Sequence, residues 1–153
     1  MRISAKADYA VRAMVELAAS AEEGNPRKGE LVAKAQEIPM PFLENILAEL
    51  RQHGLVQSRR GAEGGYWLAR LPREITLAEV IRSVEGPLAS VRGEIPERLR
   101  YRGSAEPLQR VWLALRSNIR DVLERVTLAD IVADELPPDV ADLLQPSGVP
   151  EPR

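Results

Sequence analysis

Cysteine is absent from the 153 residues of this chain. Its absence excludes disulfides, thiolate catalysis and cysteine-ligated metal sites, because each of these needs a thiol sulfur. Histidine is nearly absent as well: His53 stands alone, so a zinc or haem site would lack most of its ligands. The sequence also has no phosphate-binding loop and no histidine-centred dyad. We therefore predict that the protein is not an enzyme and holds no metal or cofactor.

Long apolar runs are missing too. No stretch approaches the roughly 20 residues with which a helix crosses a bilayer. Charged residues at Lys6, Asp8 and Arg12 interrupt the first segment, where a secretory signal peptide would be continuously apolar. With 44% hydrophobic and 29% charged residues, the chain has the composition of a globular protein. We expect a cytoplasmic protein without a membrane partner.

The net charge of −2 is unevenly distributed along the chain. Residues 1–73 hold 11 Lys and Arg against 9 Asp and Glu, whereas residues 74–153 hold 10 against 14. A mildly basic first half is compatible with binding to nucleic acid phosphates, although so small an excess is weak evidence by itself.

Three amphipathic segments and a hairpin make up the first half. Apolar spacing predicts helices over about 4–21, 30–36 and 41–53, with Ser4 capping the first and Pro41 opening the third. The residues expected to face inward on the second and third helices are Leu31, Val32, Ala35, Phe42, Leu43, Ile46, Leu47 and Leu50. Two short strands, 55–60 and 66–69, flank a glycine-rich turn at 61–65. Two short helices followed by a hairpin are typical of a winged helix-turn-helix.

The second half is dominated by one long helix. Capping patterns at Thr76 and Thr127 predict two shorter helices, and a helix over about 106–126 lies between them. Its apolar positions recur every three or four residues, which favours a dimer interface. They are Leu108, Val111, Trp112, Leu115, Ile119, Val122, Leu123 and Val126. The predicted fold is mainly α with a small β-hairpin wing and a long C-terminal dimerisation helix.

Three regions follow from these elements. Residues 1–73 form the expected DNA-binding domain. Residues 74–136 form a linker helix, an arginine-containing loop and the dimerisation helix. Residues 137–153 are proline-rich and are expected to be a disordered tail.

The third helix and the wing are the parts expected to read DNA. A recognition helix places its N-terminal residues near base edges, here Met40, Pro41, Glu44 and Asn45. Asn pairs well with adenine, and Glu accepts from the cytosine amino group. Arginine in a wing suits a narrow minor groove, and glycine lets the backbone approach the duplex closely. The wing residues are Arg59, Arg60, Gly61, Gly64 and Gly65. Expected phosphate contacts are Arg2, Lys6, Lys28, Lys34, Arg51 and Gln52.

Six segments together resemble the Rrf2 family of bacterial transcription regulators, over most of the chain. They are RISAKADYAVRAM (2–14), IPMPFLENIL (38–47), LRQHGLV (50–56), RGAEGGY (60–66), ITLAEVI (75–81) and VTLAD (126–130). The resemblance implies a homodimer with crossing long helices, bound to palindromic promoter operators. It also implies that Pro41, Phe42, Glu44 and Asn45 face the major groove and that Arg60 sits at the minor groove. We predict a repressor, and the sequence leaves activation as the alternative.

The chain also departs from this family. Many members hold an iron–sulfur cluster through three cysteines before the long helix, whereas this chain has none there. Gln109 replaces a histidine ligand of some members, and Asp8 matches a carboxylate ligand of others. Without thiolates an all-oxygen iron–sulfur site is implausible, so the chain resembles a cysteine-free branch. Glu63 stands where a small wing residue is usual, and Pro41 replaces a common hydroxyl residue.

The signal that such a regulator would sense is a separate question. Four arginines surround Tyr101 before the long helix, namely Arg92, Arg98, Arg100 and Arg102. One hypothesis is that they bind a small anionic effector, since guanidinium matches carboxylate and sulfate geometry. The alternative is a solvated loop paired with nearby glutamates. By resemblance to cluster-free relatives, a partner enzyme and a role in sulfur assimilation are further options.

A different function is compatible with the same fold. A winged helix can serve as a protein-interaction adaptor that does not bind DNA. The basic wing favours DNA binding, and a steep fall of affinity with salt would separate the two functions.

Overall fold

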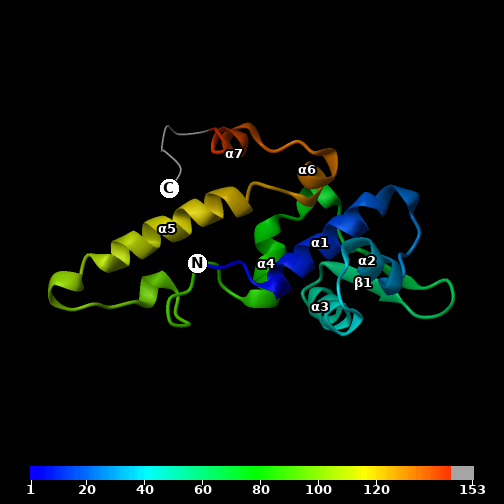
Figure 1. Ribbon diagram of the computed structural model, residues 1–153, viewed down its shortest axis with the longest axis horizontal. Helices are drawn as coiled ribbons and strands as arrows, with labels where there is room; N and C mark the ends of the chain where they lie inside the picture. The colour runs from blue at the N-terminus through cyan, green and yellow to red at the C-terminus, as the bar shows by residue number, and fades with distance from the viewer. Residues whose placement is uncertain (146–153) are drawn as a thin grey trace, which may run out of the picture.

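A helical N-terminal region, and one long helix that projects from it, make up the computed structural model, which describes residues 1–145 (Figure 1). Within these residues the fold is mainly α with one two-stranded hairpin, as predicted. None of the helices in the described part of the chain has the length and apolar character needed to cross a membrane.

Helix α1 (Ala5–Ala19) lies at the centre of this region. Ser4 caps it as predicted: its Oγ accepts a hydrogen bond from the Ala7 N–H at 3.0 Å. Apolar residues on α1 recur at helical spacing and are buried against the other elements. They are Ala7, Ala10, Ala13, Met14, Leu17 and Ala18.

Helix α2 (Gly29–Gln36) buries a different face from the predicted one. Val32 and Ala33 are buried, whereas Leu31 and Ala35 are exposed. The prediction of their burial was wrong, because a two-turn helix has too few apolar residues to define its inward face. Packing against the other helices decides which side is covered.

Helix α3 (Met40–Gln52) begins one residue earlier than predicted, so Pro41 is its second residue and Pro39 its N-cap. The predicted stripe of Leu43, Ile46, Leu47 and Leu50 is buried. Phe42 was predicted in the same stripe, but it is 60% exposed. Although Phe42 lies four residues before Ile46, it falls at the edge of the arc that the buried residues form, and therefore on the flank of the helix rather than its inner face.

Strands β1 (Val56–Arg59) and β2 (Gly65–Leu68) form the predicted hairpin in antiparallel register, with Gln57 opposite Trp67. A third segment joins them, because Arg27 pairs with Tyr66 as an isolated bridge. The wing is therefore tied to the chain that leads into α2.

Two threonines that cap helices also pair with each other, and this pairing joins the segment after the long helix to the core. Thr76 caps α4 (Leu77–Glu85) and Thr127 caps α6 (Leu128–Ala133), both as predicted. These two threonines form an antiparallel bridge. The Leu77 N–H donates to Val126 O, and the Leu128 N–H donates to Ile75 O, each at 3.0 Å.

The core therefore does not stop at residue 73. Ile75, Val80, Val84 and Leu128 belong to the same buried cluster as Met14 of α1. Elements from the predicted second region thus complete the first region's core, so the division at residue 73 does not mark two structural units.

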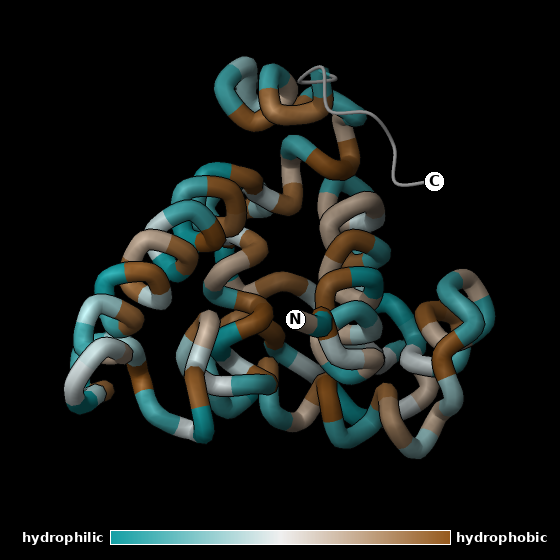
Figure 2. The backbone as a smooth tube through the Cα atoms, turned by 60° about the vertical axis from the view of Figure 1, so that its left-hand side comes forward, coloured by the Kyte–Doolittle hydropathy of each residue, from teal (hydrophilic) through white to brown (hydrophobic). Residues whose placement is uncertain are grey.

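Helix α5 (Leu108–Leu123) is shorter at both ends than the predicted 106–126. None of the residues Leu108–Leu123 is buried within the described part of the chain. In Figure 2 hydrophobic and hydrophilic residues alternate along this helix. Of its apolar stripe Val111 is exposed, and the other residues are only partly covered. Val126 differs from the rest of the predicted stripe: it lies beyond α5 and is only 3% exposed, because it packs within its own chain. It is not available to a partner.

The C-terminal region folds back along α5. A short helix, α7 (Pro138–Asp142), buries Val140, and Arg125 forms an ion pair with Asp139. The prediction of a disordered tail is therefore wrong for residues 137–145. The remainder of that tail, 146–153, lies outside the described residues.

Candidate nucleic-acid interface

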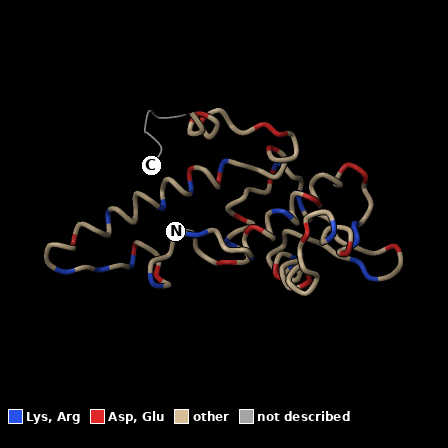
Figure 3. The backbone as a smooth tube through the Cα atoms, in the orientation of Figure 1, with Lys and Arg blue, Asp and Glu red and all other residues tan. Residues whose placement is uncertain are grey.

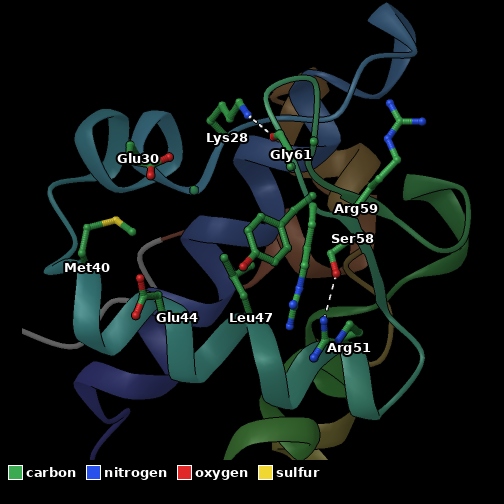
Figure 4. Close-up of a pocket in the computed structure, with 14 residues that line it drawn as sticks. Lys28, Glu30, Met40, Glu44, Leu47, Arg51, Ser58, Arg59 and Gly61 are labelled. Atoms are coloured by element: carbon green, nitrogen blue, oxygen red, sulfur yellow. Dashed lines mark hydrogen bonds between the residues drawn. The ribbon is translucent and has the colours of Figure 1, made fainter.

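One cleft of about 340 Å³ separates α3 from the wing (Figure 4). Glu44 extends into it from α3 between Met40 and Leu47. Basic residues line the cleft from three segments: Lys28 before α2, Arg51 on α3, and the pair Arg59 and Arg60 at the wing. The described structure thus brings together the helix and the wing that the sequence selected separately.

Two hydrogen bonds fix the wing relative to the helices. Lys28 donates from Nζ to Gly61 O, and Arg51 donates from Nη1 to Ser58 Oγ, each at 2.9 Å (Figure 4). Both cations were predicted as phosphate contacts, and both also position the wing. No sequence signal indicated this second role, because the partners are distant along the chain or carry ordinary surface side chains.

Glycine is required where the wing meets neighbouring backbone. Gly65 has φ +147°, and a Cβ there would lie 2.5 Å from Arg27 O. A Cβ on Gly64 would lie 2.0 Å from Arg59 O. No side chain fits at such distances, so these two glycines allow the wing its tight turn and its pairing with the chain before α2. Gly61, with φ +104°, has open space around it.

The first turns of α3 present a continuous outward surface. Pro41, Phe42, Glu44 and Asn45 are exposed and Met40 is partly exposed. Their exposure agrees with a role in base contact. For Phe42, exposure supports the role implied by family resemblance rather than the burial predicted from periodicity.

The remaining predicted phosphate contacts differ in whether their side chains already form a hydrogen bond or an ion pair. Arg60 and Arg2 are exposed and make no side-chain hydrogen bond or ion pair with residues 1–145. Arg59 donates from Nη2 to Glu63 O at 3.2 Å, and it extends away from α3 in Figure 4.

In Figure 3 the wing loop carries basic residues along one side and an acidic residue near its tip. Glu63 therefore stays a repulsive element within an otherwise basic wing.

Lys6 is the one predicted contact in the described chain whose charge is already paired. Its Nζ lies 2.9 Å from Glu49 Oε1 on α3. This ion pair connects α1 to α3, so Lys6 serves to position α3 and is not a free cation.

The loop before α5 is held by side chains of that helix. Gln109 donates to the carbonyl oxygens of Pro96 and Glu97, both at 3.2 Å. Trp112 donates from Nε1 to Tyr101 Oη at 2.9 Å, and Arg116 forms an ion pair with Glu97. The spacing of these three residues places them on one face of α5. Trp112 was predicted at the dimer interface, and in the described chain its indole N–H is bonded to its own loop.

The four loop arginines do not share one set of contacts. Arg92 lies over the Tyr101 ring at 5.9 Å, and Arg100 donates to the carbonyl oxygens of Glu97 and Leu99. Arg98 and Arg102 are exposed. None of the four forms an ion pair with a glutamate in residues 1–145. The solvated-loop alternative paired them with Glu94, Glu97 and Glu106, and that pairing is not found among these residues.

The donor set for a metal is poor throughout the described chain. No group of three His, Asp or Glu residues among residues 1–145 could hold an ion. Asp8 pairs instead with Arg12 at 3.0 Å, and the Gln109 amide is occupied by loop carbonyls. With no cysteine in the sequence, these residues do not fit an iron–sulfur cluster.

Comparison with known proteins gives one consistent family. The model of the Rrf2 family, described as an iron-dependent transcriptional regulator, matches residues 3–134. A protein of Mycobacterium tuberculosis, named as an HTH-type transcriptional regulator, is 52% identical over 147 residues, covering 94% of this chain and 88% of that one. The HTH-type transcriptional regulator CymR of Bacillus subtilis is 37% identical over 134 residues, covering 87% and 91%.

Solved structures agree with the sequence relatives. A structure of CymR, described as the global cysteine regulator of B. subtilis, superposes with a TM-score of 0.74 at 33% identity. It covers 88% of this chain and 98% of CymR. IscR of T. potens superposes with a TM-score of 0.72 at 37% identity, covering 88% of each chain.

Proposed function

Because the chain belongs to the Rrf2 family of DNA-binding transcription regulators, we propose that it acts as a homodimeric repressor on palindromic promoter operators. In this proposal the outward surface of α3 enters the major groove, with Met40, Pro41, Phe42, Glu44 and Asn45 near the bases. Arg60 enters the adjacent minor groove. Relatives are named as transcription regulators, which favours this function over a protein-interaction adaptor.

The observation that carries the proposal is the shared cleft between α3 and the wing. Lys28, Arg51 and Arg60 line it from three different segments, and none of them is paired with a carboxylate within residues 1–145. A duplex seated there would meet a recognition helix on one side and a basic wing on the other. Lys28 and Arg51 supply phosphate contacts while they hold the wing in place. Arg59 adds charge at the wing side of the cleft, and Arg2 adds charge outside it.

Dimerisation is supported by the incompletely buried apolar stripe on α5. Leu108, Val111, Leu115, Ile119 and Val122 lie at helical spacing and are not buried within residues 1–145. Apolar side chains on a long helix favour packing against a second helix of the same kind. Two copies joined through α5, with Trp112 and Leu123 at the same contact, would present two recognition helices to a two-fold symmetric operator.

The family's description as iron-dependent does not extend to this chain in our proposal. The regulator works without an iron–sulfur cluster, because the chain has no thiolate to hold one. The signal would act through another contact. An anionic effector at Arg92, Arg98, Arg100 and Arg102, or a partner enzyme, are the two routes that we propose to test. Since CymR is described as a global cysteine regulator, promoters of cysteine metabolism are the first candidates.

Mapping of the protein's binding sites across the genome tests the proposal directly. We expect a small set of promoter regions that share an inverted repeat. The repeat is then tested as a duplex by fluorescence anisotropy at several salt concentrations, beside a scrambled duplex of equal length. A dimer that uses several cations should lose affinity steeply as salt rises, by roughly 0.9 in log K per phosphate contact and per log unit of salt. Equal affinity for both duplexes would contradict the proposal.

A further inference from the structure

The inference concerns Phe42, the single phenylalanine of the chain. Phe42 is 60% exposed, although α3 buries its neighbours Leu43 and Ile46 completely or nearly so. A single exposed apolar side chain is ordinary on a protein surface, so the position of Phe42 on the helix matters more than its exposure. Its place on the third residue of α3 puts it among the residues that approach the bases of a duplex.

Residues of α1 hold the Phe42 ring in place on the side away from solvent. Tyr9 of α1 lies against it with the ring centroids 6.4 Å apart and the planes tilted by 54°. Arg12 covers the Tyr9 ring at 4.9 Å and is itself fixed by Gln36 O at 2.6 Å. A ring supported in this way loses little rotamer freedom when it binds, so its contact adds to affinity with a small entropic cost.

The chemistry of the ring selects its partner. Glu44 and Asn45 can exchange hydrogen bonds with base edges, but Phe42 has no donor or acceptor. The apolar group that the major groove displays is the C5 methyl of thymine. We infer that Phe42 is a specificity-determining residue that contacts a thymine methyl in each half of the operator. This inference rests on the proposed function, because it requires α3 to lie in the major groove.

Removal of the methyl groups alone tests the inference. Two random-sequence duplex pools are prepared with identical flanks, one amplified with dTTP and the other with dUTP. Uracil keeps every hydrogen bond of thymine and lacks only the C5 methyl. The full-length protein is used to select bound duplexes from each pool, and the base preference at each operator position is compared by sequencing.

We expect one position in each half-site at which the wild-type protein prefers thymine in the dTTP pool. In the dUTP pool this preference should fall about fourfold, which is the effect of leaving one methyl group in water. Phe42→Ala should give the reduced preference in both pools, with the other operator positions unchanged. Phe42→Leu keeps an apolar side chain and should retain part of the methyl dependence. If Phe42→Ala fails to fold, the test uses Phe42→Leu in its place.

A matched control is Leu71→Ala, which truncates another apolar residue of similar exposure, 49%, outside α3. It should keep the full methyl dependence. Identical preferences in the two pools with wild-type protein would overturn the inference, as would a methyl dependence that survives unchanged in Phe42→Ala and Phe42→Leu. If the wild-type protein enriches no sequence from the dTTP pool, the proposed function itself fails. Sequence enrichment without methyl dependence leaves that function intact and removes only the role of Phe42.

Discussion

Arg27 and Tyr66 exchange both of their backbone hydrogen bonds, with N–O distances of 2.9 and 2.8 Å. Arg27 lies just before α2, and Tyr66 lies in the returning strand of the wing. The pair adds a third segment to the two-stranded hairpin, which would be only marginally stable by itself. The helix-turn-helix and the wing are therefore one connected unit.

The first prediction tests this connection at Gly65. Gly65→Ala places a Cβ 2.5 Å from Arg27 O at φ +147°, so the backbone must shift and the pairing is lost. We expect a loss of about 1–3 kcal/mol in the free energy of unfolding, measured by urea denaturation. Gly29→Ala is the matched control, since its Cβ meets Tyr66 Cε2 at an ordinary 3.5 Å. It should change the free energy by less than about 0.5 kcal/mol. Equal effects would contradict the role of the Arg27–Tyr66 pair.

The second prediction concerns the wing arginine. Arg60→Ala should weaken operator binding by about 1–3 kcal/mol, because it removes an unpaired cation from the edge of the cleft. Arg110→Ala removes an exposed arginine from α5 and should leave the affinity within about 0.5 kcal/mol of the wild type. Gel shifts at fixed salt measure both. Unchanged affinity in Arg60→Ala would count against the assignment of the wing to DNA.

The third prediction concerns the stripe on α5. Leu115→Glu places a charge at its centre, and two such charges would lose water and oppose each other in a dimer. We expect light scattering to give the mass of one chain, 17.0 kDa, where the wild type gives twice that value. Asn118→Glu adds the same charge at an exposed position of α5 and should stay dimeric. A Leu115→Glu dimer would place the interface elsewhere.

The fourth prediction is a dependence of stability on pH. Hydrogen bonds from Arg82 of α4, and then from Arg120 of α5, lower the pKa of Glu124 from its ordinary 4.5. A lowered pKa means that the folded state binds the proton more weakly than the unfolded state. The stabilisation is therefore present above pH 4.5 and is lost as the pH falls through the lowered pKa.

Thermal melts of wild type and Glu124→Gln measure this effect. The wild type should have the higher Tm at pH 7, and the difference should shrink progressively below pH 4.5. Asp121→Gln is the control, because Asp121 is also exposed on α5 and has no ion pair within residues 1–145. A difference for Glu124→Gln that stays constant down to pH 3 would show that its interactions with Arg82 and Arg120 do not depend on charge.

The fifth prediction concerns metal and redox independence. Because the chain has no thiol, operator affinity should be the same with and without an iron chelator, and before and after treatment with diamide, a thiol oxidant. Anisotropy titrations at fixed salt provide the measurement. A loss of affinity after chelation would reveal a metal site that the donor set does not suggest.

Local sequence signals determined much of this molecule. Ser4, Thr76 and Thr127 were identified as helix caps because a cap depends on residues within one turn. The glycine-rich turn between two short strands indicated the wing for the same reason. The long stripe on α5 was visible because its apolar residues recur over more than four turns, which gives periodicity enough positions to define a face.

Tertiary structure alone decided the contacts between distant parts of the chain. Periodicity placed Phe42 in the core, and Lys6 was predicted to contact phosphate. The structure instead leaves Phe42 60% exposed on the flank of α3 and pairs Lys6 with Glu49. Val126 was assigned to a partner chain, but the bridge between Thr76 and Thr127 buries it in its own. Helical spacing determines which residues share a face. Which element covers that face depends on packing between distant parts of the chain, and local patterns do not encode it.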